Sequence, residues 1–402
     1  MLSRNYKILF SLRLLKSILT SFVDVFLVLY FINVSNNNIL PLGIYKLVAM
    51  VTVYLVVFLL RNYCKSKNRV WLMRIGIILY FIYFLAIILL KENVVDYIYL
   101  IGLLYGLEEG FYYSVYNTIE SDGIENKDRE KYLLGSYNGY KNIVSIIFPL
   151  FFGGLIQNSG FINTIIFVLV IVVLEIILSV MLKDNNIPKG DKTNLKEFKN
   201  DMKKHPELKS IIITNICSGL TYSEGALSYV ITIYIIKVFS ESVSLGIFTS
   251  IFSAISIIIG FLFANVIKPK YYIKLLGITL PITIVLLCIM LFDCNFITVV
   301  LYNLFQTISR LLSDLIKERN IFNFSNIKTI KKEYKVEYFL TLETALFIGR
   351  VISNTLFILM AFLNARFIMA IFVLFVILQA VSIIKLQYDM NKCNAVNLEL
   401  QN

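Results

Sequence analysis

Residues 42–60 read LGIYKLVAMVTVYLVVFLL, an apolar stretch whose one charged residue is Lys46. Because a helix rises about 1.5 Å per residue, a stretch of this length crosses the roughly 30 Å hydrocarbon layer of a bilayer. Similar stretches fill most of the 402-residue chain. The twelve predicted helices span residues 9–32, 40–60, 70–90, 97–118, 133–156, 161–182, 210–236, 244–266, 272–292, 295–316, 337–362 and 366–387. The sequence therefore predicts an all-α, polytopic integral membrane protein with twelve transmembrane helices.

The composition excludes several other classes of protein. Hydrophobic residues make up 58% of the chain and charged residues 16%, which leaves too little polar surface for a soluble domain. The five cysteines are scattered without a CxxC spacing, and His205 is the single histidine. No GxxxxGK[ST] phosphate-binding loop occurs in the sequence. We therefore expect no metal, no cofactor, no nucleotide site and no enzymatic activity.

The net charge is +12, and the basic residues behind it are distributed as the predicted membrane topology requires. With the N-terminus placed inside, the predicted inner loops and tails hold most of the lysines and arginines, including Arg13 and Lys16 near the start of the chain. The predicted outer loops hold only Lys91, Lys237 and Arg366. This asymmetry is the positive-inside rule, so we expect a cell-membrane protein with both termini in the cytoplasm and no nucleic-acid partner.

A polar linker divides the chain into two halves. Residues 183–210 form the longest hydrophilic run and follow the sixth apolar stretch. We therefore predict an N-terminal six-helix bundle (1–182), a cytoplasmic linker (183–209) and a C-terminal six-helix bundle (210–402). Within the linker, LKEFKNDMKKH (195–205) fits a short amphipathic helix on the inner leaflet.

The two halves resemble each other. Residues 42–60 align without a gap on LGIFTSIFSAISIIIGFLF (245–263), at an offset of 203. Residues 131–151 align on 337–357 at an offset of 206, and Asp24 and Glu224 lie 200 apart. Similar offsets in the same order indicate a duplicated six-helix unit.

This architecture resembles the major facilitator superfamily of secondary transporters. LLRNYCKSKNRVW (59–71) keeps the basic residues of that family's GxxxDRxGRR loop but lacks its glycine and aspartate. FPLFFGG (148–154) is similar to the helix-5 GPxxGG motif of its antiporters, with one extra residue, and Gly135 matches an earlier glycine. EYFLTLETALFIGRVISN (337–354) resembles a poorly characterised branch of low-GC Gram-positive bacteria. The resemblance implies two pseudo-symmetric bundles that alternate access to a central site.

Charges inside the apolar stretches mark the candidate site, because each is costly at the bilayer centre. In GLLYGLEEGFYYSVYN (102–117), Glu109 shares a helix face with Tyr112, which suits a proton-coupling site, an anchor for a cationic solute or a structural acid. Gly102, Gly106 and Gly110 permit close helix packing. We expect Glu108 to be structural, and pair Asp24 with Lys141 because the family places helices 1 and 5 side by side.

In the C-terminal half, the family packing of helices 7 and 11 predicts a pair between Glu224 and Arg350. Glu343 shares the face of Arg350 but lies two turns away, so the sequence does not assign it as the partner. Arg310 and Asp314 form a predicted surface pair or inner gate. We expect Glu175 to be structural, on an outer helix, and Lys46 to snorkel to the outer interface.

These residues predict a secondary transporter that carries a small molecule, with Asp24, Glu109, Tyr112, Lys141, Glu224, Glu343 and Arg350 along the pathway. Proton-coupled export of an amphipathic molecule by a monomer is the leading hypothesis. Import of a nutrient such as a sugar or peptide is the alternative within the class. A non-transporting receptor on the same fold and a membrane-embedded transferase are the alternatives from other classes; the transferase lacks a loop with clustered acids or histidines.

Overall fold

The computed structural model describes residues 4–63, 69–122, 138–183, 194–203, 205–221, 225–268, 271–326, 335–363 and 365–399. Helices form all the regular secondary structure in these ranges, which contain no strand. Each helix satisfies its own backbone hydrogen bonds, and its side chains are mostly apolar. Both properties are required of a segment that crosses a bilayer.

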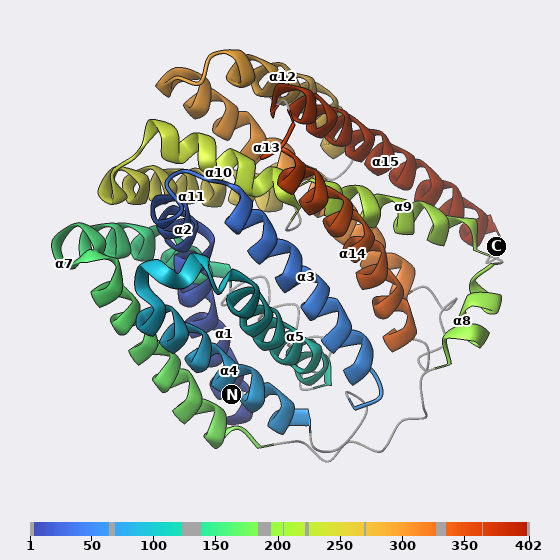
Figure 1. Cartoon of the computed structure of the whole chain (residues 1–402). Coiled ribbons are helices and arrows are strands. Elements are labelled where there is room, and N and C mark those ends of the chain that lie inside the picture. The colour runs from blue at the N-terminus through green and yellow to red at the C-terminus, as the bar shows by residue number, and fades with distance from the viewer. Residues whose placement is uncertain are drawn as a thin grey trace. The chain divides into compact units, whose positions relative to one another are not determined.

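Figure 1 shows the helices of the two halves. The N-terminal half contains α1 (Arg4–Phe22), the π-helix η1 (Val23–Leu27), α2 (Val28–Val34), α3 (Leu40–Leu60), α4 (Arg69–Leu90), the 3-10 helix η3 (Lys91–Val95), α5 (Ile98–Asp122) and α7 (Asn138–Met181). The rest of the chain contains α8 (Leu195–Met202), α9 (Pro206–Leu220), α10 (Ala226–Val238), α11 (Ser242–Asn265), α12 (Tyr272–Phe292), α13 (Phe296–Asn326), α14 (Lys335–Leu359) and α15 (Ala365–Glu399).

The helices follow the predicted apolar stretches. Within the described residues, nine helices are long and apolar enough to cross a membrane. One of them, α7, covers two predicted stretches, and Gly160, with a φ of 80° and a ψ of 168°, marks the kink between them. The stretch 97–118 coincides with α5, and 210–236 is shared by α9 and α10. The predicted class, an all-α polytopic membrane protein, is confirmed.

The chain forms two compact units. The first comprises Met1–Lys192 and Ile235–Ala254, and the second comprises Thr193–Tyr234 and Ile255–Asn402. Residues 235–254 therefore group with the first unit although they follow the predicted linker. The bundle boundaries derived from the sequence remain a prediction.

Helix contacts within the units repeat. In the first unit, α1 packs on α7, and α4 packs on both α5 and α7. In the second unit, α9 packs on α14, and α12 packs on both α13 and α15. In terms of predicted helix order, the first helix of each half meets the fifth, and the third meets the fourth and the sixth. These contacts agree with a duplicated six-helix unit, whereas among the described residues the extensive contact of α3 with α5 has no counterpart of similar size between α11 and α13.

The first predicted helix of each half departs from α-helical geometry at repeat-equivalent positions. Asp24 lies in the π-helix η1, between α1 and α2. In the other half, α9 ends at Leu220 and α10 begins at Ala226. Interruptions of this kind inside membrane helices are tolerated where protein or a polar cavity surrounds them, and they often mark functional positions.

Glycines bring α5 against α3, as their spacing predicts. A Cβ at Gly106 would lie 2.5 Å from the carbonyl oxygen of Ala49 and 2.6 Å from Cβ of Thr52. Gly102 and Gly110 face α3 in the same way, one turn to either side. This close contact fixes the position of Glu108 and Glu109, which lie between these glycines on α5.

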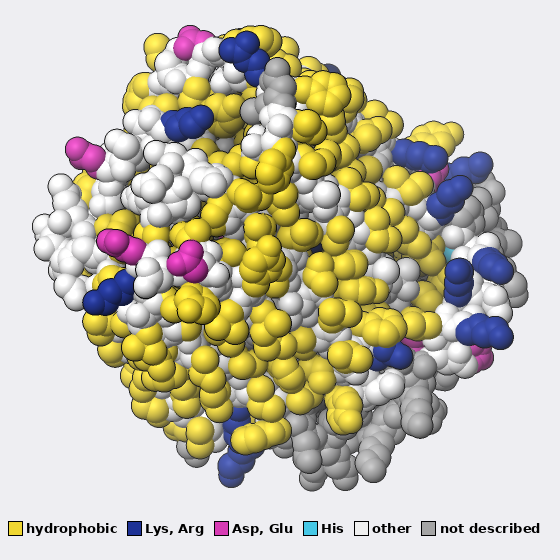
Figure 2. Space-filling model, in the orientation of Figure 1, with side chains coloured by type: hydrophobic (Ala, Val, Ile, Leu, Met, Phe, Trp, Pro, Cys, Tyr) yellow, Lys and Arg dark blue, Asp and Glu magenta, His cyan; other side chains and the backbone are white. Residues whose placement is uncertain are grey.

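The exposed faces of the outermost helices are apolar. On α7, for example, Ile166, Val170, Leu174 and Ile177 are exposed. Figure 2 shows how widely hydrophobic side chains cover the molecular surface. Such surface is stable in contact with lipid chains and not in contact with water.

Candidate functional site

Lys16 of α1 is the charged centre of the first unit. Its side chain is only 3% exposed, and its ammonium contacts the carboxylates of Glu108 and Glu109 on α5. The distance from Nζ to Oε1 of Glu109 is 2.9 Å, and Oε1 of Glu108 accepts a hydrogen bond from the same ammonium. Glu108 is fully buried, whereas the side chain of Glu109 is 12% exposed. One lysine is therefore shared by two consecutive carboxylates.

Tyrosine rings surround this ammonium. Its nitrogen lies 4.0 Å from the ring centroid of Tyr80 on α4, 5.1 Å from that of Tyr112 and 5.8 Å from that of Tyr113, both on α5. Cation–π attraction at such distances partly replaces the hydration that burial removes from the lysine. Tyr112, predicted as a pathway residue, is itself buried and packs against the charge centre.

Glu175 adds a third carboxylate from α7. It is fully buried, and neither of its oxygens has a hydrogen-bond partner among the described residues. The positive charge of Lys16 acts on it electrostatically. Glu175 was expected to be structural, on an outer helix. Its neighbours Leu174 and Ile177 are exposed, but Glu175 itself is buried on the inward face of this part of α7.

The acid cluster, which we define as Lys16, Glu108, Glu109 and Glu175, contains more acidic than basic groups. Removing a charge from water is expensive unless an opposite charge compensates it. If all three carboxylates were ionised, the single lysine would leave an excess of negative charge in the interior. A proton or a cation can supply the missing positive charge.

The structure describes the side chains of two of the three remaining predicted residues of the first unit. Asp24 is exposed, at the π-helix that interrupts the first membrane helix. The side chain of Lys141 lies outside the described residues, so the pairing of Asp24 with Lys141 stays a prediction. Lys46 does not snorkel, contrary to expectation: it is 1% exposed, with its ammonium 5.4 Å from the ring centroid of Tyr45 and 5.8 Å from that of Tyr105.

In the second unit, Arg350 pairs with Glu343 on the same helix. The Nη1–Oε1 distance is 2.8 Å. A separation of two turns along the helix axis does not by itself predict this pair. Helix side chains lean toward the N-terminus, however, so the long arginine reaches back to Glu343. Glu224 lies outside the described residues, and its pairing with Arg350 stays a prediction.

A polar seam runs beside this pair. Thr221 at the end of α9 donates a hydrogen bond of 2.6 Å to Oε1 of Gln379 on α15. The backbone N–H of Ala226, where α10 begins, donates to Oγ of Ser353 at 2.7 Å. The side chain of Ser353 thereby satisfies one of the free donors at the start of α10 and stabilises the interrupted helix.

Arg310 and Asp314 form the predicted local pair on α13. Nε of Arg310 lies 3.8 Å from Oδ2 of Asp314, and Nζ of Lys317 lies 3.9 Å from Oδ1. Both members of the pair are substantially exposed, at 50% and 38%, which agrees with a weak surface pair. A gating role for these residues stays a prediction.

Lys16 is the residue of the candidate site that sequence reasoning missed. It was counted among the charges of the inner tail, which is wrong, because the structure buries it. The available signal was its place inside the apolar stretch 9–32, where a lysine needs a partner as much as Asp24 does. Its partners lie some ninety residues further along the chain, beyond the reach of helical periodicity.

Taken together, the helical fold, the duplicated contacts and the buried charges define a polytopic membrane protein of the transporter type. The family model described as "Major Facilitator Superfamily" matches residues 9–313. The chain belongs to this superfamily of secondary transporters.

Two kinds of relative support this placement. A protein of Bacillus subtilis (strain 168), named "Uncharacterized protein YqgE", is 25% identical over 343 residues, which cover 82% of this chain and 77% of that protein. This relative agrees with the expected low-GC Gram-positive branch.

Among solved structures, a bacterial homolog of the human lysosomal transporter Spinster has a TM-score of 0.62 at 15% identity, covering 97% of this chain and 98% of the other. The nucleoside transporter NupG has a TM-score of 0.65 at 12% identity, covering 96% and 99%. At these identities the structures show a shared fold and nothing about substrate.

Proposed function

We propose that this protein is a proton-coupled exporter of a small amphipathic molecule. It works as a monomer in the cell membrane, with both termini in the cytoplasm, and alternates access to the two sides. The observation that carries the coupling hypothesis is the lysine of α1 shared between Glu108 and Glu109 of α5, with Glu175 close by.

Proton binding to Glu109 would change the helix contacts in a defined way. An ionised Glu109 accepts from the ammonium of Lys16, while a protonated Glu109 loses most of that attraction and gains an O–H donor. Lys16 would then depend on Glu108 alone. Because Lys16 and Glu109 belong to different helices, the proton alters the tie between α1 and α5. A ligand shifts a conformational equilibrium when it binds one state better than another, and here the proton is that ligand.

Glu109 fits this role better than Glu108. Both carboxylates contact the same ammonium, but Glu109 keeps 12% of its side-chain surface accessible whereas Glu108 has almost none. A proton must reach the coupling carboxylate and leave it again, so the more accessible acid suits the exchange. Glu108 then anchors Lys16 in both protonation states.

The partial antiporter motif on α7 is what favours export over import in this proposal. Pro149 and Gly153 belong to the stretch that resembles the antiporter motif. A Cβ at Gly153 would lie 2.6 Å from the carbonyl oxygen of Ser242, and one at Gly246 would lie 2.5 Å from that of Pro149. The two helices therefore cross almost backbone to backbone at this motif. Its glycine permits the close contact between α7 and α11.

Asp24 in the first unit and three charged residues of the second unit are the residues that we assign to substrate binding. In the first unit, Asp24 is exposed at a helix interruption, which suits recognition of a polar or cationic group. In the second unit, we keep Glu224, Glu343 and Arg350 as pathway residues. The tyrosine rings beside the charges of the first unit suit the apolar part of an amphipathic molecule.

The experiment that tests this function measures the sensitivity of a host strain to a panel of toxic amphipathic compounds. Expression of the protein should raise resistance to at least one compound, and dissipating the proton gradient should remove that resistance. Glu92→Gln, at an exposed acid of η3, is the matched control for substitutions in the acid cluster. Resistance that survives loss of the proton gradient would reject proton coupling.

The nutrient importer remains the second candidate. Growth rescue on one sugar, peptide or other metabolite, without any gain in resistance, would replace export by import. If neutralising every charge of the acid cluster left the cellular phenotype intact, the non-transporting receptor would be favoured.

A further inference from the structure

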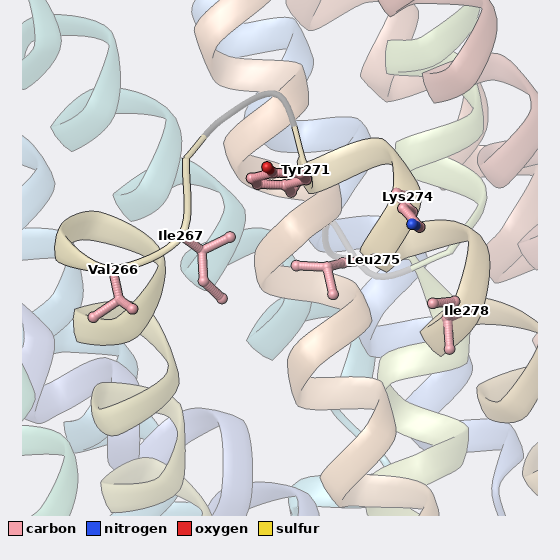
Figure 3. Close-up of a pocket in the computed structure, with 6 residues that line it drawn as sticks. All are labelled: Val266, Ile267, Tyr271, Lys274, Leu275 and Ile278. Carbon is pink, nitrogen blue, oxygen red and sulfur yellow. The ribbon is translucent and has the colours of Figure 1, made fainter.

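A shallow groove of about 370 Å³ opens on the second unit, where α11 leads into α12. Figure 3 shows the residues that line it: Val266, Ile267, Tyr271, Lys274, Leu275 and Ile278. Its volume falls in the range of small-ligand sites. Lys274 contributes the one charged side chain of the lining, and the others are apolar or aromatic.

The groove is built on a rigid floor. Ile267 and Leu275 pack against a buried cluster that includes Phe263, Tyr272 and Leu276. The hydroxyl of Tyr272 donates to the carbonyl oxygen of Phe263 at 2.8 Å, which ties the start of α12 to the end of α11. The groove is therefore formed before any ligand arrives, and its occupant need not repay the entropy of ordering it.

The charges of the chain segment that forms the groove have a single sign. Residues 242–292, which include α11 and α12, contain three lysines, at positions 268, 270 and 274, and no acidic residue. Lys268 and Lys274 are exposed, and Tyr271 beside them is 47% exposed. Lysine and tyrosine side chains of this kind are typical of the boundary between lipid headgroups and acyl chains.

An apolar track continues from the groove along α12. Ile278, Ile282, Val285 and Ile289 are exposed at spacings of three and four residues, so they form one stripe down the helix. The stripe begins one turn below Lys274. A cationic head position followed by a groove and a long apolar stripe matches the shape of a phospholipid.

We propose that this groove binds an anionic glycerophospholipid. The phosphate lies between Lys268 and Lys274, the glycerol region lies beside Tyr271, and one acyl chain enters the groove and follows the stripe on α12. A zwitterionic phospholipid fits the same apolar surface but adds a positive headgroup next to the lysines. The lysines therefore select the anionic lipid, by about fivefold each.

The single tryptophan of the chain provides a direct test. Replacing Trp71 by Phe and Ile282 by Trp leaves one fluorophore on the stripe below the groove. Replacing Leu374 instead gives a reference probe on the exposed face of α15. Each protein is placed in mixed micelles with phosphatidylglycerol or phosphatidylcholine that carries bromine on the acyl chains, and the quenching of tryptophan fluorescence is titrated.

At position 282, phosphatidylglycerol should quench at a concentration about 25-fold lower than phosphatidylcholine does, because two lysines contribute about fivefold each. At position 374 the two lipids should be equivalent. Lys274→Gln should lower the difference to about fivefold, and Lys268→Gln with Lys274→Gln should abolish it. Lys209→Gln, at an exposed lysine of the same unit, should leave it unchanged. Equal quenching at position 282, or a preference that survives the double substitution, would overturn the proposal.

Discussion

Nζ of Lys16 lies 2.9 Å from Oε1 of Glu109, with three tyrosine rings within 6 Å of the same nitrogen. Lys16 is only 3% exposed, so its charge is stabilised chiefly by these protein groups. This arrangement joins α1 to α5 through an interaction whose strength depends on protonation. Stability and coupling therefore depend on the same atoms, and each can be measured separately.

Lys16→Met should destabilise the protein strongly. The substitution keeps much of the side-chain volume but leaves Glu108 and Glu109 buried without their cation. Breaking a buried pair from one side lowers the free energy of unfolding by about 3–5 kcal/mol. Denaturation with SDS in mixed micelles measures this change, and Lys209→Met, at an exposed lysine, should stay within about 0.5 kcal/mol of the wild type.

Removing the acids as well should reverse much of the loss. In the triple variant with Lys16→Met, Glu108→Gln and Glu109→Gln, neither of the two carboxylates that contact Lys16 is left behind, so much of the stability should return. Equal instability of the single and triple variants would show that Lys16 acts through packing, not through its charge.

Glu109→Gln should separate coupling from folding. Glutamine keeps the shape of the side chain and can accept from Lys16, but it cannot bind a proton at its oxygen in the physiological range. We expect folded protein in the membrane and loss of pH-dependent transport of the compound identified in the resistance screen. Glu92→Gln should transport with the wild-type pH profile. A pH profile that is unchanged by Glu109→Gln would make this carboxylate structural.

The sequence predicted the fold well because the bilayer imposes length and polarity on every crossing. A stretch such as 272–292 is apolar all round, and the structure places α12 over the same residues. The close approach of α5 and α3 was also predictable, since Gly102, Gly106 and Gly110 recur at the spacing of one helix face.

The acid cluster was predictable only in part. Periodicity identified Glu109 and its face but could not show which helix supplies its partner, because Lys16 and Glu109 meet only after the bundle has formed. The same limit applies to Glu175, whose helix has a lipid-facing side and an inward side. Arg350 shows a different limit. The spacing of residues along the helix axis does not include the length of an arginine side chain, or its lean toward the N-terminus of the helix.

Gly106→Ala should weaken the contact between α5 and α3. The added Cβ would meet the carbonyl oxygen of Ala49 at 2.5 Å, and neither backbone can yield without moving its helix. Overpacking of this kind costs about 1–3 kcal/mol. Gly277→Ala makes the same change in open space on α12, so it should be neutral or slightly stabilising. Equal SDS unfolding midpoints for the two variants would contradict the close packing.

Cysteine labelling should establish the orientation. Cys294 lies between α12 and α13, at a predicted outer loop, whereas Cys64 and Cys393 are predicted to be cytoplasmic and lie outside the part of the structure in which side chains are described. In single-cysteine variants on intact cells, an impermeant maleimide should label position 294 first. Labelling of position 64 or 393 before the cells are opened would invert the topology.

Two double-mutant cycles should decide the partner of Arg350. The 2.8 Å contact with Glu343 predicts a coupling of about 1 kcal/mol between Arg350→Gln and Glu343→Gln, because the pair is partly exposed. The repeat argument predicts a second coupling, between Arg350→Gln and Glu224→Gln. If both couplings appear, Arg350 is shared by two carboxylates, as Lys16 is in the first unit, and the duplication extends to the charge centre. Additive losses in the Glu224 cycle would show that Glu224 does not interact with Arg350. A basic residue shared by two carboxylates would then occur in the N-terminal half alone, and the proposed proton coupling would involve α1 and α5.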